Sequence, residues 1–163
     1  MQFERVFLHF GAVFFLLGIV FAGCSRGSGN LKSDASPSEV QVTLREWSVA
    51  VDRGTVRPGR ITFQTANRGT EDHELVILRT DLPADALSLR DDRVDEATAG
   101  RILGEIEPFA PATEKELTLD LEPGSYVLLC NIVETENGQK EGHYTMGMRI
   151  AFKVESPRSR PSE

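Results

Sequence analysis

The sequence predicts an all-β protein, a β-sandwich of about seven to eight strands with one helical or loop excursion near residues 81–103. Two observations predict this fold. Apolar and polar residues alternate with a period of two in several short segments, as they do in strands with one buried face. Turn-forming Pro, Gly and Asn residues separate these segments. Short strands joined by such turns are typical of two antiparallel sheets packed face to face.

The first predicted strand carries Val40, Val42 and Leu44 on one face. A change of phase at Arg45-Glu46 is interpreted as a bulge before the next apolar stretch. Turn signals at 57–59, 67–70 and 122–124 separate the later strands, which we expect at 61–65, 74–79, 116–121, 126–130 and 147–154. Residues 75–78 are apolar on both faces, so the strand that contains them is predicted to be central. Trp47 and Phe63 are predicted to pack in the core.

The N-terminus has the features of an export signal. Arg5 precedes an apolar run over residues 6–22, which ends in Phe21-Ala22-Gly23-Cys24. An apolar run followed by small residues fits a signal peptidase. The final cysteine resembles that of a bacterial lipobox, which implies that Cys24 is lipid-modified and becomes the mature N-terminus. An uncleaved signal anchor is the alternative. In both cases we expect a location in the bacterial periplasm or at the cell exterior, with a membrane anchor.

Four regions are predicted along the chain. Residues 1–23 form a lipoprotein signal peptide, 24–38 a flexible tether rich in Ser and Gly, 39–155 the folded domain and 156–163 a disordered tail. The length of 163 residues suits a single domain. The 18 Lys and Arg residues against 25 Asp and Glu residues give a net charge of -7, which argues against nucleic-acid binding. Two cysteines exclude a disulfide scaffold and a four-cysteine zinc site.

The mature chain would keep few residues with soft or borderline donor atoms. These are one free thiol, two imidazoles and two thioethers, at Cys130, His73, His143, Met146 and Met148. Two histidines and one cysteine with a weak axial methionine form the site of blue electron-transfer copper proteins. Zinc would usually recruit a fourth Cys, His or carboxylate ligand instead of Met. A Cys/His hydrolase would need an exposed nucleophile and a third, orienting group.

Three sequence elements resemble the cupredoxin family over roughly residues 40–154. They are Asn67-x-Gly69 followed by His73-x-Leu75, then Pro123-Gly124-x-Tyr126-x-x-x-Cys130, then Gly142-His143-x-x-x-Gly147-Met148. The resemblance implies a Greek-key sandwich that binds one type 1 copper ion. The implied ligands are His73, Cys130, His143 and Met148, with Met146 as the alternative axial ligand.

The resemblance also implies roles around the site. Asn67 and Glu74 are candidates to support the ligands, and His143 is expected near the surface as the route for electrons toward a partner. The loop over residues 131–142 is longer than in familiar small members of the family. Its polar composition and its Asn-Gly pair predict an excursion that returns to the site.

The leading functional hypothesis is a membrane-tethered carrier of single electrons that is not itself an enzyme. Expected partners are redox proteins, such as a basic cytochrome or a membrane oxidoreductase, and the lipid bilayer through Cys24. The acidic residues between 91 and 96 could steer a basic partner. Two alternatives use the same fold. One is a copper storage or delivery protein with the same ligands, and the other is a copper-free interaction module.

Overall fold

The structure, a computed structural model, describes residues 37–136 and 138–156. The predicted signal peptide, Cys24 and most of the predicted tether and tail lie outside the described residues. Within the described ranges, no helix is long and apolar enough to cross a membrane.

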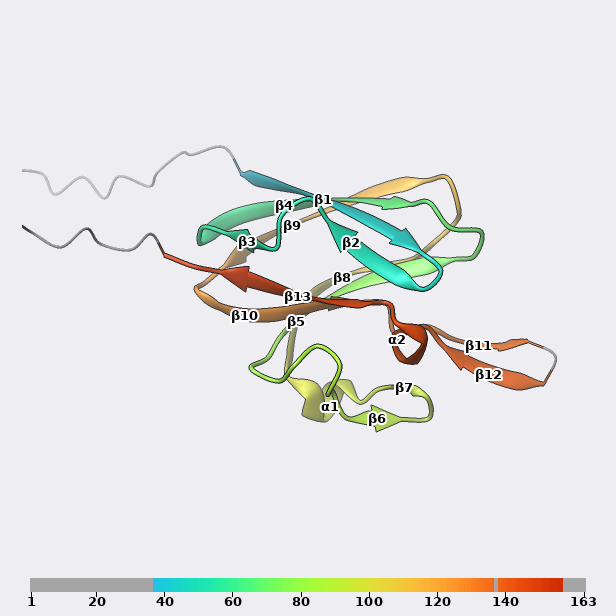
Figure 1. The fold of residues 1–163 in the computed structure, drawn as a ribbon. Coiled ribbons are helices and arrows are strands. Elements are labelled where there is room, and N and C mark those ends of the chain that lie inside the picture. The colour runs from blue at the N-terminus through green and yellow to red at the C-terminus, as the bar shows by residue number, and fades with distance from the viewer. Residues whose placement is uncertain (1–36, 137, 157–163) are drawn as a thin grey trace, which may run out of the picture. The chain divides into compact units, whose positions relative to one another are not determined.

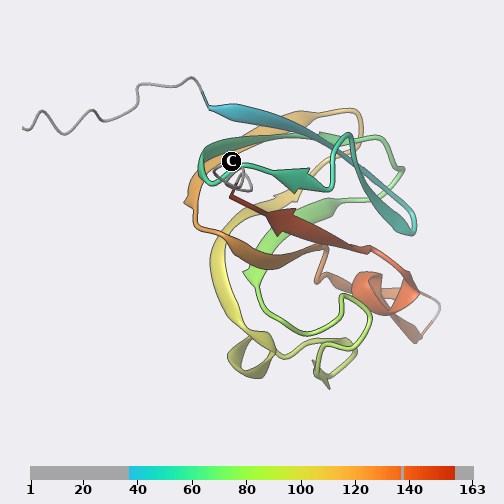
Figure 2. The same cartoon turned by 60° about the vertical axis from the view of Figure 1, so that its left-hand side comes forward.

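Two sheets form the sandwich of the described domain (Figures 1 and 2). The first sheet has the order β2-β1-β4-β9 and comprises β2 (Ser48–Val51), β1 (Ser38–Arg45), β4 (Gly59–Asn67) and β9 (Glu114–Leu121). The second has the order β3-β13-β10-β5-β8 and comprises β3 (Thr55–Val56), β13 (Arg149–Val154), β10 (Gly124–Leu129), β5 (His73–Arg79) and β8 (Arg101–Phe109). The predicted all-β sandwich is confirmed.

Three details differ from the sequence prediction. The two sandwich sheets of the described domain contain nine strands instead of seven to eight, because β3 and β8 were not expected. The sheets are mixed instead of antiparallel, since β1 pairs in parallel with β4 and β3 pairs in parallel with β13. The phase change at Arg45-Glu46 is a tight turn instead of a bulge, with Arg45 paired to Ser48 in a β1–β2 hairpin.

The core lies between the two sheets, where the inward-facing residues of the strands meet. Val40, Val42 and Leu44 of β1 are at most 1% exposed, as their alternation predicts. Phe63 of β4 meets Phe152 of β13 edge to face, with 5.6 Å between the ring centroids. The interior of the sandwich is therefore continuous and apolar. Its close packing fixes the strands and the positions of their ends.

The central strand β5 is buried on both faces. Leu75 and Ile77 face the sandwich core, whereas Val76 and Leu78 belong to a second apolar cluster outside the sheet. The excursion near 81–103 covers that outer face with β6 (Leu89–Arg90), β7 (Arg93–Val94) and the one-turn helix α1 (Glu96–Ala99). The short helix α2 (His143–Met146) joins the same cluster through Tyr144. Before α2, the hairpin β11 (Val133–Glu136) and β12 (Gln139–Gly142) projects from one end of the domain (Figure 1).

Candidate metal centre

Three predicted ligand residues meet at one end of the sandwich. His73 is the first residue of β5, Cys130 follows the last residue of β10, and His143 is the first residue of α2. All three are 0% exposed. The sheet places His73 and Cys130 together because β5 and β10 are hydrogen-bonded neighbours. The returning hairpin β11–β12 then brings His143 to the same point.

The donor atoms of these residues face one another. Nδ1 of His73 lies 3.3 Å from Nδ1 of His143, and that second Nδ1 lies 3.3 Å from Sγ of Cys130. All three donor atoms lie within 4.8 Å of one another. Nitrogen and sulfur ligands bind such a metal ion at about 2.0–2.3 Å, so two ligands of one ion stand about 3–4 Å apart. The observed separations therefore fit one metal ion held by two imidazoles and a thiolate.

Burial acts in opposite ways on the imidazoles and on the thiol: it keeps the imidazoles neutral but also keeps the thiol protonated. It lowers the pKa of His73, although Glu46 opposes this effect. Burial, together with repulsion from His73, lowers the pKa of His143 to about 4. Burial also raises the pKa of the Cys130 thiol to about 12. At neutral pH both imidazoles are therefore neutral donors, and a metal ion has to displace the thiol proton as it binds.

Hydrogen bonds from backbone N–H groups hold the ligand segments together. The Cys130 N–H donates to the Met148 carbonyl at 3.1 Å, and the Met148 N–H donates to the His143 carbonyl at 3.0 Å. The His143 N–H donates to the carbonyl of Ile132 at 2.9 Å. The Glu74 N–H donates to Sγ of Cys130 at 3.4 Å, which ties the first ligand strand to the thiol.

The two candidate axial methionines have opposite environments. Met148 is 0% exposed and packs in the same apolar cluster as Cys130. Met146 lies on α2 and is 48% exposed. Only Met148 of the pair is therefore buried beside the cysteine, as the Gly147-Met148 pattern before the last strand favours. Gly147 has φ +132, and a Cβ there would come 2.8 Å from the carbonyl oxygen of Trp47.

Asn67 and Glu74 hold the backbone around the ligands. The Asn67 amide donates to the carbonyls of Glu71 and Phe109 at 2.8 and 2.9 Å, and its Oδ1 accepts the Gly69 N–H at 3.0 Å. Asn67 thereby fixes the loop that leads into His73. The carboxylate of Glu74 accepts the Asn131 N–H at 2.8 Å, directly after Cys130. Both residues therefore contact backbone groups of the segments that carry His73 and Cys130.

His143 is buried instead of lying near the surface. The ring of Trp47, in the turn between β1 and β2, stands edge-on to the His143 ring with 5.2 Å between the centroids. Trp47 is half-buried, so it covers the site as well as packing against the core. This cover was not predicted, because the contact joins the β1–β2 turn to the first residue of α2, 96 residues later in the sequence, and no local pattern marks it.

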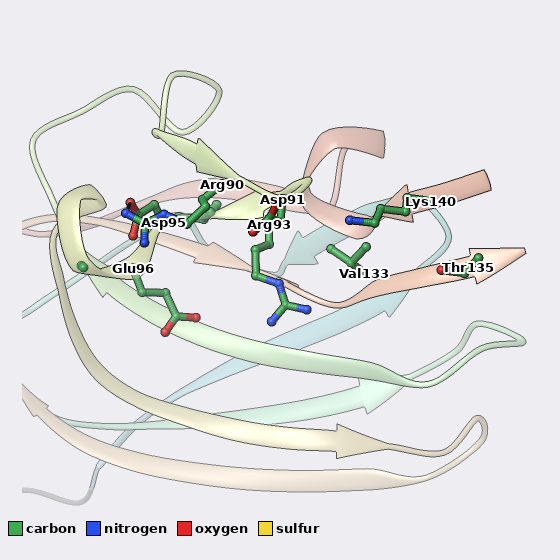
Figure 3. A pocket seen from close by; sticks show the side chains of 10 residues that line it. Arg90, Asp91, Arg93, Asp95, Glu96, Val133, Thr135 and Lys140 are labelled. Atoms are coloured by element: carbon green, nitrogen blue, oxygen red, sulfur yellow. Dashed lines mark hydrogen bonds and ion pairs between the residues drawn. The ribbon is translucent and has the colours of Figure 1, made fainter. Parts of the chain in front are cut away.

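A groove of about 630 Å³ lies between the excursion and the β11–β12 hairpin (Figure 3). Acidic and basic side chains share its lining. Asp95 pairs with Arg90 at 2.8 Å, and Arg93 extends from β7 toward Val133 of β11. Glu96 accepts a hydrogen bond from the Asn131 amide at 2.9 Å. The acidic residues between 91 and 96 thus stand among basic groups and do not form a uniformly acidic face.

No protein-family model and no curated protein sequence matches the chain. Solved structures do. Dithionite-reduced auracyanin from Roseiflexus castenholzii has 21% identity and a TM-score of 0.51, with 74% of this chain and 99% of auracyanin covered. Auracyanin A, a blue copper protein from Chloroflexus aurantiacus, has 15% identity and a TM-score of 0.49, with 74% and 100% covered. Rusticyanin from Thiobacillus ferrooxidans has 19% identity and a TM-score of 0.45, with 74% and 79% covered.

The first of these likenesses, together with the strand order and the His-Cys-His cluster, agrees with the family resemblance read from the sequence. The described domain has the cupredoxin fold.

Proposed function

We propose that this protein is a type 1 copper protein that carries single electrons between redox partners. The observation that carries the proposal is the fully buried cluster of His73, Cys130 and His143, with the buried Met148 beside the cysteine. Imidazole, thiolate and thioether together are the ligand set of blue electron-transfer sites.

The residues of the chain supply the rigidity that electron transfer needs. A bound copper ion would supply the one-electron couple between Cu(II) and Cu(I). Thiolate and thioether suit the reduced ion and imidazole accommodates the oxidised ion, so one arrangement can serve both states. The backbone hydrogen bonds around Cys130, His143 and Met148 keep that arrangement fixed. The buried position of the ligands excludes water, which would otherwise reorganise at each transfer.

The test is to load the purified protein with Cu(II) and to record its visible and EPR spectra. We expect an intense thiolate-to-copper charge-transfer absorption that is lost in Cys130→Ser. Bleaching with a reductant and recovery with an oxidant, without release of copper, would support electron transfer. A colourless complex, or preferential binding of zinc, would rule out the proposal.

Copper storage or delivery is a second candidate, favoured by one observation. The Met146 thioether is 48% exposed and stands three residues after His143, so it could capture Cu(I) at the surface. The complete burial of the three main ligands opposes rapid exchange. Fast transfer of copper from the reduced protein to a chelator would favour delivery, whereas retention of the metal would favour electron transfer.

We further infer an extracytoplasmic, lipid-anchored location and a basic redox partner. The apolar run that ends at Cys24 supports the anchor. Carboxylates near the ligands support the partner, since Glu46, Asp72 and Glu134 all attract a positive charge at His73. Cys24→Ala should release the protein from the membrane fraction. The association rate with a basic cytochrome should fall as salt is added.

A further inference from the structure

A glutamate outside the predicted ligand set approaches the outer nitrogen of His73. Oε1 of Glu46, in the turn between β1 and β2, lies 3.3 Å from Nε2 of His73, a buried nitrogen that has no aligned hydrogen-bond partner among the described residues. The same oxygen accepts the N–H groups of Thr70 and Glu71 at 2.6 and 3.0 Å. Glu46 is therefore held by the loop that precedes His73, and its position does not depend on the histidine alone.

Glycine at position 69 makes this approach possible. A Cβ at Gly69 would overlap Oε1 of Glu46 and would come 2.8 Å from Nε2 of His73. Any other residue would push the carboxylate and the imidazole apart. Two turns that are distant in sequence thus converge on the side of His73 that faces away from Cys130.

The carboxylate of Glu46 is ionised at neutral pH. Two backbone N–H groups, those of Thr70 and Glu71, donate to its Oε1, and hydrogen bonds of this kind favour the charged form of a carboxylate. Its side chain is 23% exposed, so water screens the charge only in part.

We propose that Glu46 is a positioning residue of the metal centre, which keeps the His73 proton on Nε2, directs Nδ1 toward the metal, and favours the oxidised ion. A carboxylate that accepts the outer N–H of a metal-bound histidine fixes the ring and its tautomer and raises the basicity of the ligand. The negative charge near the site also stabilises the more positive ion. The second part of the proposal rests on the proposed function, because it requires a redox-active metal.

The proposal also predicts the tautomers of His73 and His143 in the metal-free protein. The two Nδ1 atoms stand 3.3 Å apart, and a hydrogen bond between them requires one ring to donate and the other to accept. If Glu46 keeps the His73 proton on Nε2, Nδ1 of His73 is the acceptor and Nδ1 of His143 carries the proton. The two histidines then have different tautomers. The carboxylate of Glu71 lies 3.8 Å from Nε2 of His143, so contact with a carboxylate is closer on the His73 side.

The first experiment measures tautomers and needs no metal. Nitrogen-15 NMR of the imidazole rings in the metal-free full chain should show the Nε2–H form for His73. In Glu46→Gln the ratio of the Nε2–H form of His73 to its Nδ1–H form should fall at least tenfold. Glu116→Gln is the matched control, because it removes the same charge from an exposed position on β9. Equal tautomer populations in the wild type and in Glu46→Gln would overturn the positioning role.

The second experiment measures the preference of the loaded site for Cu(II) over Cu(I). Glu46→Gln should lower this preference about tenfold, which is a rise of about 59 mV in the reduction potential of a one-electron couple. Glu116→Gln should change it less than twofold. Gly69→Ala, which displaces the carboxylate but keeps its charge, should shift the potential in the same direction by less. An unchanged potential in Glu46→Gln would overturn the charge effect.

The two experiments separate this inference from the proposed function. If the wild type forms no blue copper site, the proposed function fails, but the tautomer measurement still tests the role of Glu46. If the blue site forms and both Glu46 measurements show no change, the proposed function stands and the role of Glu46 is excluded. Amide exchange at Asn67 and Arg68, whose N–H groups donate to the carbonyls of Thr113 and Leu44 and not to Glu46, checks that the loop of each variant keeps its structure.

Discussion

Two buried asparagines hold the two halves of the candidate metal centre in different ways. Asn67 stands in the loop before His73 and is 0% exposed, whereas Asn131 follows Cys130 and is 4% exposed. Two of the three side-chain bonds of Asn67 stay within four residues of it. Asn131 reaches instead across 35 to 37 residues to the excursion, at Val94 and Glu96. The first half of the site is therefore built mainly by a local turn, and the second half depends on a distant part of the chain.

The largest expected effect comes from the long-range half. In Asn131→Ala, Val94 loses the partners of both its N–H and its carbonyl, which bond to the Asn131 side chain at 2.6 and 3.1 Å. Val94 is only 2% exposed, so water does not readily replace these bonds. Since each buried unpaired group costs about 1–3 kcal/mol, we expect the free energy of unfolding to fall by about 3 kcal/mol.

Urea unfolding followed by the fluorescence of Trp47 measures this loss. The control is Gln64→Ala, whose amide donates to Glu116 on the exposed face of the first sheet and should cost less than about 0.5 kcal/mol. A loss below about 1 kcal/mol in Asn131→Ala would mean that water enters and satisfies Val94.

The local half should be less sensitive. Asn67→Ala removes bonds to the carbonyls of Glu71 and Phe109 and to the Gly69 N–H. Only the bond to Phe109 is fully buried, so we expect a loss of about 2 kcal/mol in the same unfolding assay. Asn67→Asp keeps the acceptor for Gly69 and serves as the partial variant. A larger loss in Asn67→Ala than in Asn131→Ala would reverse the comparison.

The contact between α2 and the excursion gives a smaller test. The hydroxyl of Tyr144 donates to the Ala84 carbonyl at 2.8 Å and accepts the Leu87 N–H at 3.1 Å. Tyr144→Phe should cost about 1 kcal/mol and should speed amide exchange in α2. Tyr126→Phe is the matched control, since its hydroxyl donates to the Glu122 carbonyl at 2.7 Å. It should cost a similar amount and leave exchange in α2 unchanged, whereas equal exchange in the two variants would exclude a role of Tyr144 in holding α2.

The same contrast between local and distant contacts explains what the sequence could predict. Local alternation located β1 through Val40, Val42 and Leu44, and a scarcity of Cys and His residues drew attention to the three groups that the fold brings together. Strand β8 was missed because Glu105, Glu107 and Pro108 interrupt its apolar pattern.

The surroundings of the ligands could not be predicted for a related reason. Glu46 and Trp47 reach the two histidines only because the β1–β2 turn folds over the loop before His73 and over α2. Such contacts depend on how the sheets pack, and period-two alternation carries no information about them. For the same reason the burial of His143 was not predicted, since Trp47, which covers it, lies in the distant β1–β2 turn.

The smallest expected changes in stability are those of substitutions at the two methionines of the long-range half. Met146→Leu replaces a 48% exposed side chain with one of similar volume, so the free energy of unfolding should stay within about 0.5 kcal/mol of the wild-type value. Met148→Leu is a volume-conserving change at a fully buried position and should cost less than about 1.5 kcal/mol. Stability alone therefore distinguishes them poorly.

Their spectra in the copper-loaded protein should differ clearly. Met148 shares the buried cluster of Cys130, and its backbone bonds to both Cys130 and His143, so its thioether is the one placed to act as the weak axial ligand. We expect Met148→Leu to shift the charge-transfer band and raise the reduction potential, and Met146→Leu to leave both unchanged. A spectral shift confined to Met146→Leu would require α2 to turn its exposed face inward when copper binds. Metal binding would then rearrange the long-range half of the site.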